Sequence, residues 1–135
     1  MKPIVATAIA ASVLAFALDV IAQAPSPSPP AGIKRTLLQR GDIGNNMEVV
    51  LGLAEISPGG ATGRHTHFGT ETGMVLEGSA SIEIEGETPR LMKAGDSYII
   101  PAGKVHDAKT VGDGPVKVLA TYVVEKGKPL ATPAK

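Results

Sequence analysis

The fold of this chain is decided by one stretch, GGATGRHTHFGTETGMVLEG, residues 59–78. It holds His65 and His67 two residues apart, Glu71 four residues later, and glycines at both ends. Side chains two apart in a β-strand project from the same face, so the two imidazoles are expected to lie side by side. With a carboxylate arriving from the next turn, they form a nitrogen and oxygen ligand set that several divalent metals accept.

A second stretch, GDSYIIPAGKVH, residues 95–106, supplies a fourth candidate ligand, His106. An isolated histidine is most simply an ordinary buried, hydrogen-bonded side chain. The chain has only three histidines, however, and all of them fall in these two stretches. This clustering favours one divalent ion, which the ligand types allow to be Fe, Mn, Ni, Zn or Cu. Because the chain has no cysteine, disulfides and thiolate metal sites are excluded.

The two stretches resemble the two signature motifs of the cupin superfamily. The first motif, G-x5-H-x-H-x3-E-x6-G, is met in full across residues 59–78, and the second, G-x5-P-x-G-x2-H-x3-N, is met from Gly95 to His106. The chain departs from the second motif at its last position, where Thr110 stands for Asn. The resemblance covers about residues 47–125 and is closest to small, quercetin dioxygenase-like cupins. It implies a metal held by His65, His67, Glu71 and His106.

The resemblance also raises three questions about single residues. In some cupins the carboxylate is a mobile ligand or a base, so Glu71 is a candidate catalytic residue as well as a ligand. Gly73 is expected on the same face as Glu71, where the missing side chain leaves space for a bound molecule, although a β-bulge would explain it equally well. Thr110 offers only a hydroxyl, so its support of His106 is in question.

Composition limits the remaining possibilities. The 135 residues carry 13 basic and 13 acidic side chains, which gives no electrostatic case for nucleic acid or an anionic membrane surface. Sixteen glycines and regularly spaced turns favour an all-β chain. Short strands at this spacing fit either a sandwich or a barrel. The resemblance chooses a single double-stranded β-helix (jelly-roll) barrel.

The predicted strands alternate with Gly- and Pro-containing turns. In the strand 79–85, Ala80, Ile82 and Ile84 are expected to face the protein core, and Ser81 and Glu83 are expected to face water. The expected strands are 34–39, 47–56, 64–68, 71–77, 79–85, 89–93, 97–100, 105–110 and 116–124.

The N-terminus has the composition of an export signal. Lys2 precedes an apolar run from Ile4 to Leu18, which is shorter than the ~20 residues that span a bilayer, and small residues follow. Cleavage is expected before Gln23, or before Pro25 as a second choice. The mature protein is therefore expected to be secreted, in a bacterium to the periplasm, without stable membrane insertion. The expected organisation is a signal peptide 1–22, a proline-rich linker 23–33, a cupin barrel 34–126 and a tail 127–135 that lies as a loose strap on the surface.

Three functions fit these observations. One is a mononuclear metal-dependent, oxygenase-type enzyme that acts on a small organic molecule, because three His and one Glu leave coordination positions open. Another is a non-catalytic periplasmic module that binds a metal or a small ligand, since fold does not settle function. A sugar-binding or isomerase-type cupin is disfavoured because the chain has only four aromatic residues. The resemblance also suggests a homodimer built partly from residues 34–39.

Overall fold

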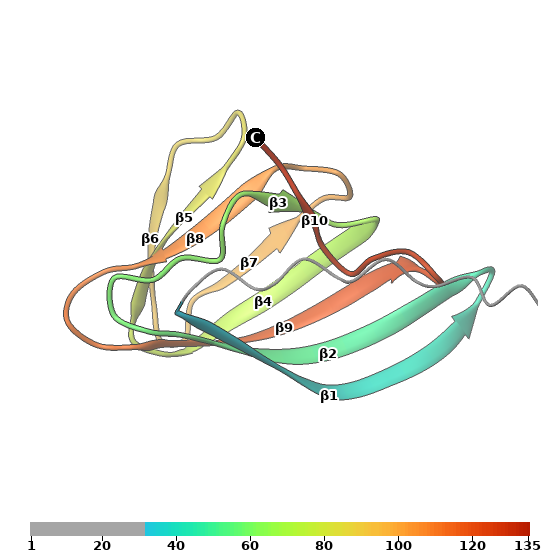
Figure 1. The fold of residues 1–135 in the computed structure, drawn as a ribbon, viewed down its shortest axis with the longest axis horizontal. Helices are drawn as coiled ribbons and strands as arrows, with labels where there is room; N and C mark the ends of the chain where they lie inside the picture. The colour runs from blue at the N-terminus through green and yellow to red at the C-terminus, as the bar shows by residue number, and fades with distance from the viewer. Residues whose placement is uncertain (1–31) are drawn as a thin grey trace, which may run out of the picture.

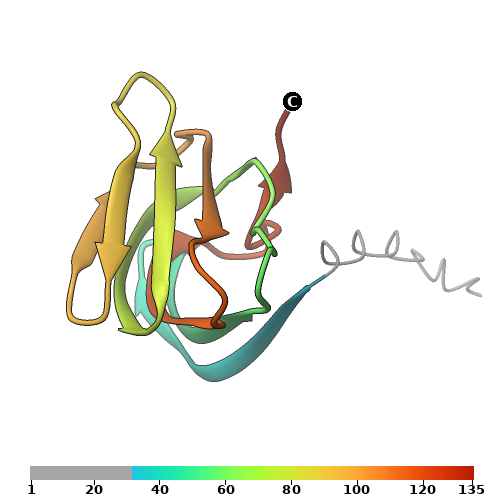
Figure 2. The same ribbon diagram turned by 90° about the vertical axis from the view of Figure 1, so that its left-hand side faces the viewer.

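The computed structural model describes residues 32–135, so the expected signal peptide and nearly all of the linker lie outside the described residues. The described chain is all-β, and it forms two five-stranded antiparallel sheets that face each other as a jelly-roll barrel (Figures 1 and 2). Within this range the structure contains no apolar helix of the length that a membrane crossing requires. The strands are β1 (Ile33–Gly44), β2 (Met47–Ile56), β3 (His65–Thr66), β4 (Gly69–Glu77), β5 (Ser79–Ile84), β6 (Arg90–Lys93), β7 (Ser97–Ile100), β8 (His106–Thr110), β9 (Val116–Glu125) and β10 (Thr132–Pro133).

The predicted all-β fold and the positions of most strands are confirmed. The largest difference is at β1, which runs to Gly44 rather than ending at Gln39. Pairing with β2 extends it, since β1 follows that strand along its whole length, with a register shift between Leu37 and Gln39 that accommodates an extra residue. The turn to β2 uses Asn45 and Asn46 at positive φ, a conformation that asparagine tolerates.

The first sheet has the order β1-β2-β9-β4-β7, and the second has the order β10-β3-β8-β5-β6. The core lies between them. Alternation in β5 places Ala80, Ile82 and Ile84 inside, each less than 5% exposed, as predicted. They meet Ile56 and Val75 from the first sheet. Each buried Ile or Val side chain in this set contributes roughly 1.5–3 kcal/mol, so apolar packing stabilises this end of the barrel.

Small residues keep the middle of the first sheet thin on its inner face. Gly52 in β2 is opposite Ala120 in β9, which is opposite Gly73 in β4. Ala54, two residues after Gly52, also faces inward. Tyr98 covers Gly73, and Ala54 and Ala120 line the space between the sheets that becomes the cavity described below.

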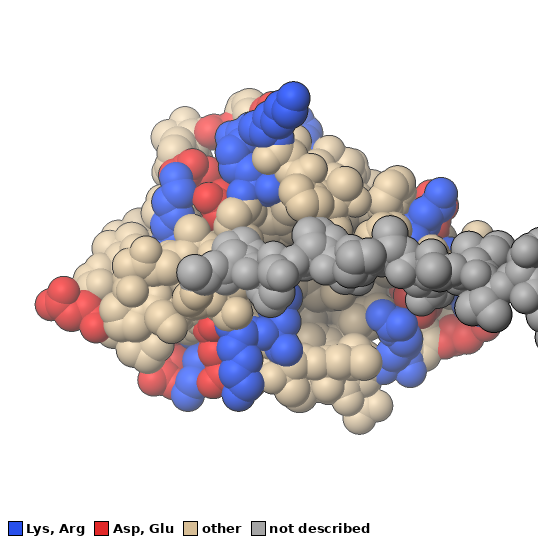
Figure 3. Space-filling model, in the orientation of Figure 1, with Lys and Arg blue, Asp and Glu red and all other residues tan. Residues whose placement is uncertain are grey.

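The surface carries both signs of charge. On the face seen in Figure 3, Lys and Arg side chains are interspersed with Asp and Glu rather than forming one basic area. Ion pairs among the described residues include Lys109 with Glu83 and Lys117 with Glu77.

Candidate metal centre

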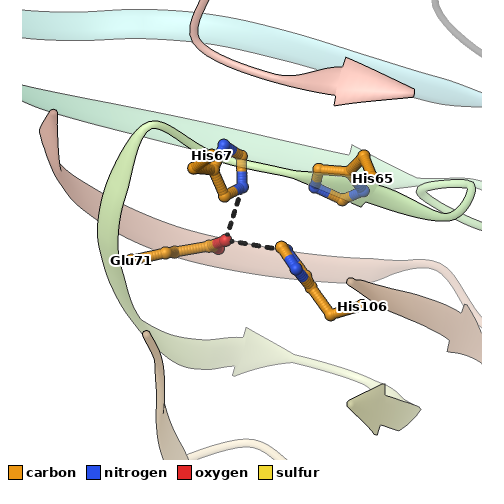
Figure 4. Close-up of side chains that lie close together, drawn as sticks. All are labelled: His65, His67, Glu71 and His106. Atoms are coloured by element: carbon orange, nitrogen blue, oxygen red, sulfur yellow. Dashed lines mark hydrogen bonds and ion pairs between the residues drawn. The ribbon is translucent and has the colours of Figure 1, made fainter. Parts of the chain in front are cut away.

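The two sheets bring the four predicted ligands to one place. Glu71 comes from β4 in the first sheet, whereas His65 and His106 form a cross-strand pair of β3 and β8 in the second. His67 follows β3 in the turn to β4, and its ring lies 4.9 Å from that of His65 between centroids. One ligand atom from each residue lies within 4.8 Å of those from the other three. Figure 4 shows the four side chains converging.

Backbone carbonyls fix the orientation of all three imidazoles. His65 Nδ1 is 2.6 Å from the Gly63 carbonyl, and His106 Nδ1 is 2.9 Å from the Lys104 carbonyl. The Nδ1 of His67 is 2.5 Å from the carbonyl of Leu130. A carbonyl oxygen only accepts, so each Nδ1 must carry the proton. In its neutral form each ring then presents the lone pair of Nε2, which is the form that binds a metal.

The nitrogens meet a carboxylate that also only accepts. Glu71 Oε2 lies 2.9 Å from His67 Nε2 and 3.1 Å from His106 Nε2. The close approach to His67 lacks hydrogen-bond geometry, so that buried Nε2 has no hydrogen-bond partner among the described residues. Lone pairs directed at a carboxylate repel it unless a proton or a metal cation lies between them. The donor set therefore fits a divalent ion held by His65, His67, Glu71 and His106.

Electrostatics of the site agree with these ligand roles. Burial lowers the pKa of His65 to about 4, so this ring is neutral near pH 7. Burial alone would raise the pKa of Glu71, but the imidazoles of His106 and His67 outweigh it and lower the pKa to about 2. Burial likewise opposes the charged form of His106, yet its hydrogen bond to Glu71 raises its pKa above the ordinary value. Glu71 is thus ionised and ready to bind a cation.

Tyr98 completes the surroundings of Glu71 and corrects the interpretation of Gly73. The Tyr98 hydroxyl donates a 2.7 Å hydrogen bond to Glu71 Oε1. Its ring lies against Gly73, where an added Cβ would come 2.3 Å from Cζ of the tyrosine. The expectation that Gly73 leaves space for a bound molecule was therefore wrong, because Tyr98 fills that space. No bulge lies at Gly73 either, since the register shift of β4 falls between Val75 and Glu77.

The position that departs from the motif has a role away from the metal. Thr110 donates from its hydroxyl to the Gly60 carbonyl at 3.3 Å and makes no hydrogen bond to His106. His106 is supported by the Lys104 carbonyl instead. The Lys104 carbonyl therefore gives His106 the support that the side chain at position 110 was expected to give.

A buried network fixes the loop that leads to His65. The Thr62 hydroxyl donates to the Asp107 carboxylate at 2.9 Å and accepts from the Ala108 amide at 2.9 Å. The Thr62 amide donates to the Ala108 carbonyl, so the loop pairs with β8 much as a strand would. Asp107 is only 6% exposed. This network holds the loop beside the centre, and the sequence motifs gave no indication of it.

The C-terminal tail belongs to the barrel rather than lying loosely on it. Thr132 and Pro133 form β10 and pair with β3, opposite Thr66 and His65. The Ala134 amide donates to the Arg64 carbonyl. Because the carbonyl of Leu130 orients His67, the tail also helps to build the centre. The expectation that the tail lies loosely on the surface was therefore wrong, because backbone pairing with β3 orders these residues.

The centre opens into a cavity of about 420 Å³. This volume lies in the range of small-molecule sites. Besides the four candidate ligands, its wall holds two tyrosines, Tyr98 and Tyr122, and it is otherwise mainly apolar. Burial raises the pKa of both phenols, so both keep their protons at neutral pH. Sequence reasoning named these tyrosines only as aromatics, because the register that turns them inward is set by pairing across distant strands.

Comparison with known proteins identifies the family. The profile of the Cupin domain family matches residues 52–122, more than half of the chain and nearly the whole inner part of the barrel. The chain belongs to the cupin family. The match includes all four candidate ligands, so the family assignment and the geometry converge on the same centre.

Curated relatives of this cupin include plant germin-like proteins. It is 35% identical over 83 residues to germin-like protein subfamily 2 member 1 of Arabidopsis thaliana. It is 30% identical over 83 residues to germin-like protein 5-1 of Oryza sativa subsp. japonica. Each alignment covers 58% of this chain but only 38% of the relative. The chain thus spans well under half the length of these relatives.

Solved structures confirm the architecture. A recombinant oxalate oxidase in complex with glycolate superposes with a TM-score of 0.63 at 25% identity, covering 78% of this cupin and 57% of that chain. A cupin-2 domain protein from Rhodospirillum rubrum gives a TM-score of 0.64 at 19% identity, over 80% and 69% of the two chains. The DMSP lyase DddQ from Ruegeria pomeroyi DSS-3 gives 0.66 at 22% identity, over 76% and 52%. The last two matches show the fold alone.

Proposed function

We propose that this cupin is an exported, mononuclear metal-dependent protein that acts on a small organic molecule, with oxygenase-type chemistry as its reaction class. The observation that carries the proposal is the orientation of the imidazoles. Three carbonyls hold three Nδ1 protons outward, so three Nε2 atoms face one ionised carboxylate inside a cavity. His106 Nε2 lies within hydrogen-bond distance of Glu71 and donates to it only when both nitrogens of the ring are protonated. His67 Nε2 has no hydrogen-bond partner among the described residues, so a purely structural network would leave this buried atom unsatisfied.

Each residue of the centre has a role that follows from its contacts. His65, His67 and His106 would hold the ion through Nε2, and Glu71 would hold it through Oε2. A bound divalent ion would supply Lewis-acid or redox chemistry at positions that the four ligands leave open. Tyr98 keeps one oxygen of Glu71 occupied and fixes the carboxylate. If Glu71 leaves the ion during a reaction, it becomes the base of this cavity.

Relatives support a small-molecule reaction without naming it. One solved structure with a similar fold is an oxalate oxidase that contains glycolate, and another is a DMSP lyase. Both are proteins that act on small organic molecules according to their names. The apolar wall of the cavity in this cupin suits a molecule with a carbon skeleton, bound with its polar end toward the centre.

A non-catalytic binding module is the alternative, and one observation favours it. Both oxygens of Glu71 are engaged, and no other carboxylate or imidazole among the described residues lines the cavity beyond the four ligands. A general base separate from the ligand set is therefore missing from the wall. Under this alternative the protein would hold a metal or a small ligand in the periplasm without turning it over.

The discriminating experiment is turnover by protein of defined metal content. The exported protein is purified from its native host, stripped of metal, and reloaded with Fe, Mn, Ni, Zn or Cu. Oxygen uptake is then measured with flavonols, dicarboxylates and diketones. Metal-dependent uptake that disappears in His106→Ala supports the enzyme, whereas tight ligand binding without product supports the binding module. A wild-type protein that takes up no divalent ion would contradict the enzyme and a metal-binding module alike.

Export is part of the proposal and has its own test. The basic and apolar composition of residues 1–22 supports a signal peptide whose removal leaves Gln23 at the N-terminus. Mass spectrometry of protein secreted to the periplasm of a bacterial host should find that mature mass, or the mass beginning at Pro25. Exported protein that still carries Met1 would contradict this part of the proposal.

A further inference from the structure

Arg35 is a cation on the wall of the same cavity. It lies on β1 opposite the inward-facing Ala54, and it lines the cavity together with the four candidate ligands. Its guanidinium has one polar contact with the described residues, the Thr62 carbonyl at 3.5 Å. That distance is at the limit of a hydrogen bond, and Arg35 is an exposed residue, so most of the five N–H donors of this guanidinium have no partner among the described residues and are open to solvent or a ligand.

The other arginine on the wall is engaged differently. Arg64 donates from Nε to the Lys135 carbonyl at 3.0 Å and lies 3.8 Å from Glu85. Arg35, in contrast, forms no ion pair within residues 32–135. The single carboxylate on the cavity wall, Glu71, is already bound by two imidazoles and a phenol. Nothing in the described wall therefore neutralises Arg35.

The strand register places Arg35 away from the centre and separates the two by apolar wall. Glu71 is opposite Tyr122 on β9, whereas Ala54, the partner of Arg35, is opposite Val118 on the same strand. Four residues of extended strand span about 13 Å along the strand direction. Arg35 and Glu71 are also three strands apart across the sheet, whose order is β1-β2-β9-β4-β7. Between the two rows the wall is made by Ala120.

We propose that the cavity binds a small organic anion whose carboxylate pairs with Arg35 while its other polar end faces the metal centre. This inference rests on the proposed function, because it uses the same cavity and adds the class of molecule that enters it. The planar fork of a guanidinium matches a carboxylate with two parallel hydrogen bonds. The alanine and valine side chains between the two ends suit a short methylene chain. Arg35 is thus a specificity-determining residue.

The test is calorimetric binding to zinc-loaded full-length protein, with succinate, glutarate and adipate as probes. Acetate and adipate monomethyl ester serve as ligands that can reach only one end. The wild type is expected to bind at least one of the three dicarboxylates more tightly than acetate. Arg35→Gln should weaken that dicarboxylate by about tenfold to a hundredfold, as expected for loss of a charge-assisted pair, and should leave acetate unchanged. Arg35→Lys should recover part of the loss, because it keeps the charge without the fork.

Arg40→Gln is the matched control, since Arg40 lies on the same strand, pairs with Glu48 at 3.6 Å and does not line the cavity. It should bind all probes as the wild type does, and both variants should keep the wild-type Tm and zinc content. Equal dicarboxylate affinity in wild type and Arg35→Gln would overturn this inference and leave the metal centre standing. Absence of zinc uptake by the wild type would overturn the proposed function, and this inference with it.

Discussion

Replacing Gly73 by alanine tests how the first sheet holds Glu71. The added Cβ would lie 2.3 Å from Cζ, 2.4 Å from the hydroxyl oxygen and 2.7 Å from Cε1 of Tyr98. Ordinary contact begins at about 3.5 Å, so the ring must move by more than 1 Å. That movement would break the 2.7 Å hydrogen bond from Tyr98 to Glu71.

The magnitude follows from two losses. Overpacking of a filled interior costs about 1–3 kcal/mol, and a hydrogen bond to a charged group contributes about 1.5–3 kcal/mol. Gly73→Ala should therefore lower the free energy of unfolding by about 2.5–6 kcal/mol, a large part of the 5–15 kcal/mol typical of a domain. Urea unfolding followed by circular dichroism measures this change.

A matched control and a double-mutant cycle make the result specific. Gly41 lies in a strand, and an added Cβ there would meet only Val49 Cγ1 at 3.7 Å, so Gly41→Ala should change stability by less than about 1 kcal/mol. In a Tyr98→Ala background the space beside Gly73 is open, and Gly73→Ala should then be nearly neutral. If Gly73→Ala is as mild as Gly41→Ala, or equally costly with and without Tyr98, the account of this contact is refuted.

Three further predictions concern parts of the molecule around the centre. Deleting residues 127–135 should leave a folded barrel but weaken metal binding about 10–100-fold, because His67 loses the Leu130 carbonyl that orients it. Unchanged metal affinity would show that the tail has no such role. Thr62→Val should lower the free energy of unfolding by about 1–3 kcal/mol, because the Asp107 carboxylate and the Ala108 amide would each lose a hydrogen-bond partner. Thr72 is exposed, so Thr72→Val should be nearly neutral. Equal losses of stability in the two variants would count against the loop network. In metal-free protein, His65 binds a proton near pH 6.5 in the unfolded chain but only near pH 4 in the folded chain. The stability of the wild type relative to His65→Asn should therefore fall as the pH is lowered between these values. Parallel stability profiles of the two proteins over this pH range would contradict the burial of this ring.

The sequence predicted the ligands better than their surroundings. His65, His67 and Glu71 lie in one short stretch, where local geometry sets which side chains share a face, whereas the resemblance to the cupin motifs is what joined His106 to them. The inward positions of Ala80, Ile82 and Ile84 follow from alternation in the same way. The local pattern was sufficient wherever neighbours in sequence were also neighbours in the site.

What the sequence could not predict depends on pairing between distant strands. Tyr98 reaches Glu71 because β7 pairs with β4 in the register that places it opposite Gly73, and local pattern does not specify that register. The same reason explains why Gly73 was misinterpreted as open space. Leu130 and Arg35 enter the site from the two ends of the described chain, so no motif links them to the histidines.

The central claim is a divalent ion held by four side chains, and elemental analysis of natively exported protein tests it most directly. Wild type should contain about one equivalent of a divalent transition metal per chain, and Thr110→Ala should retain it because Thr110 makes no hydrogen bond to His106. His65→Ala, His67→Ala and His106→Ala should each lose most of it under the same dialysis. Equal metal content in the wild type and in all three histidine variants would contradict the centre described here.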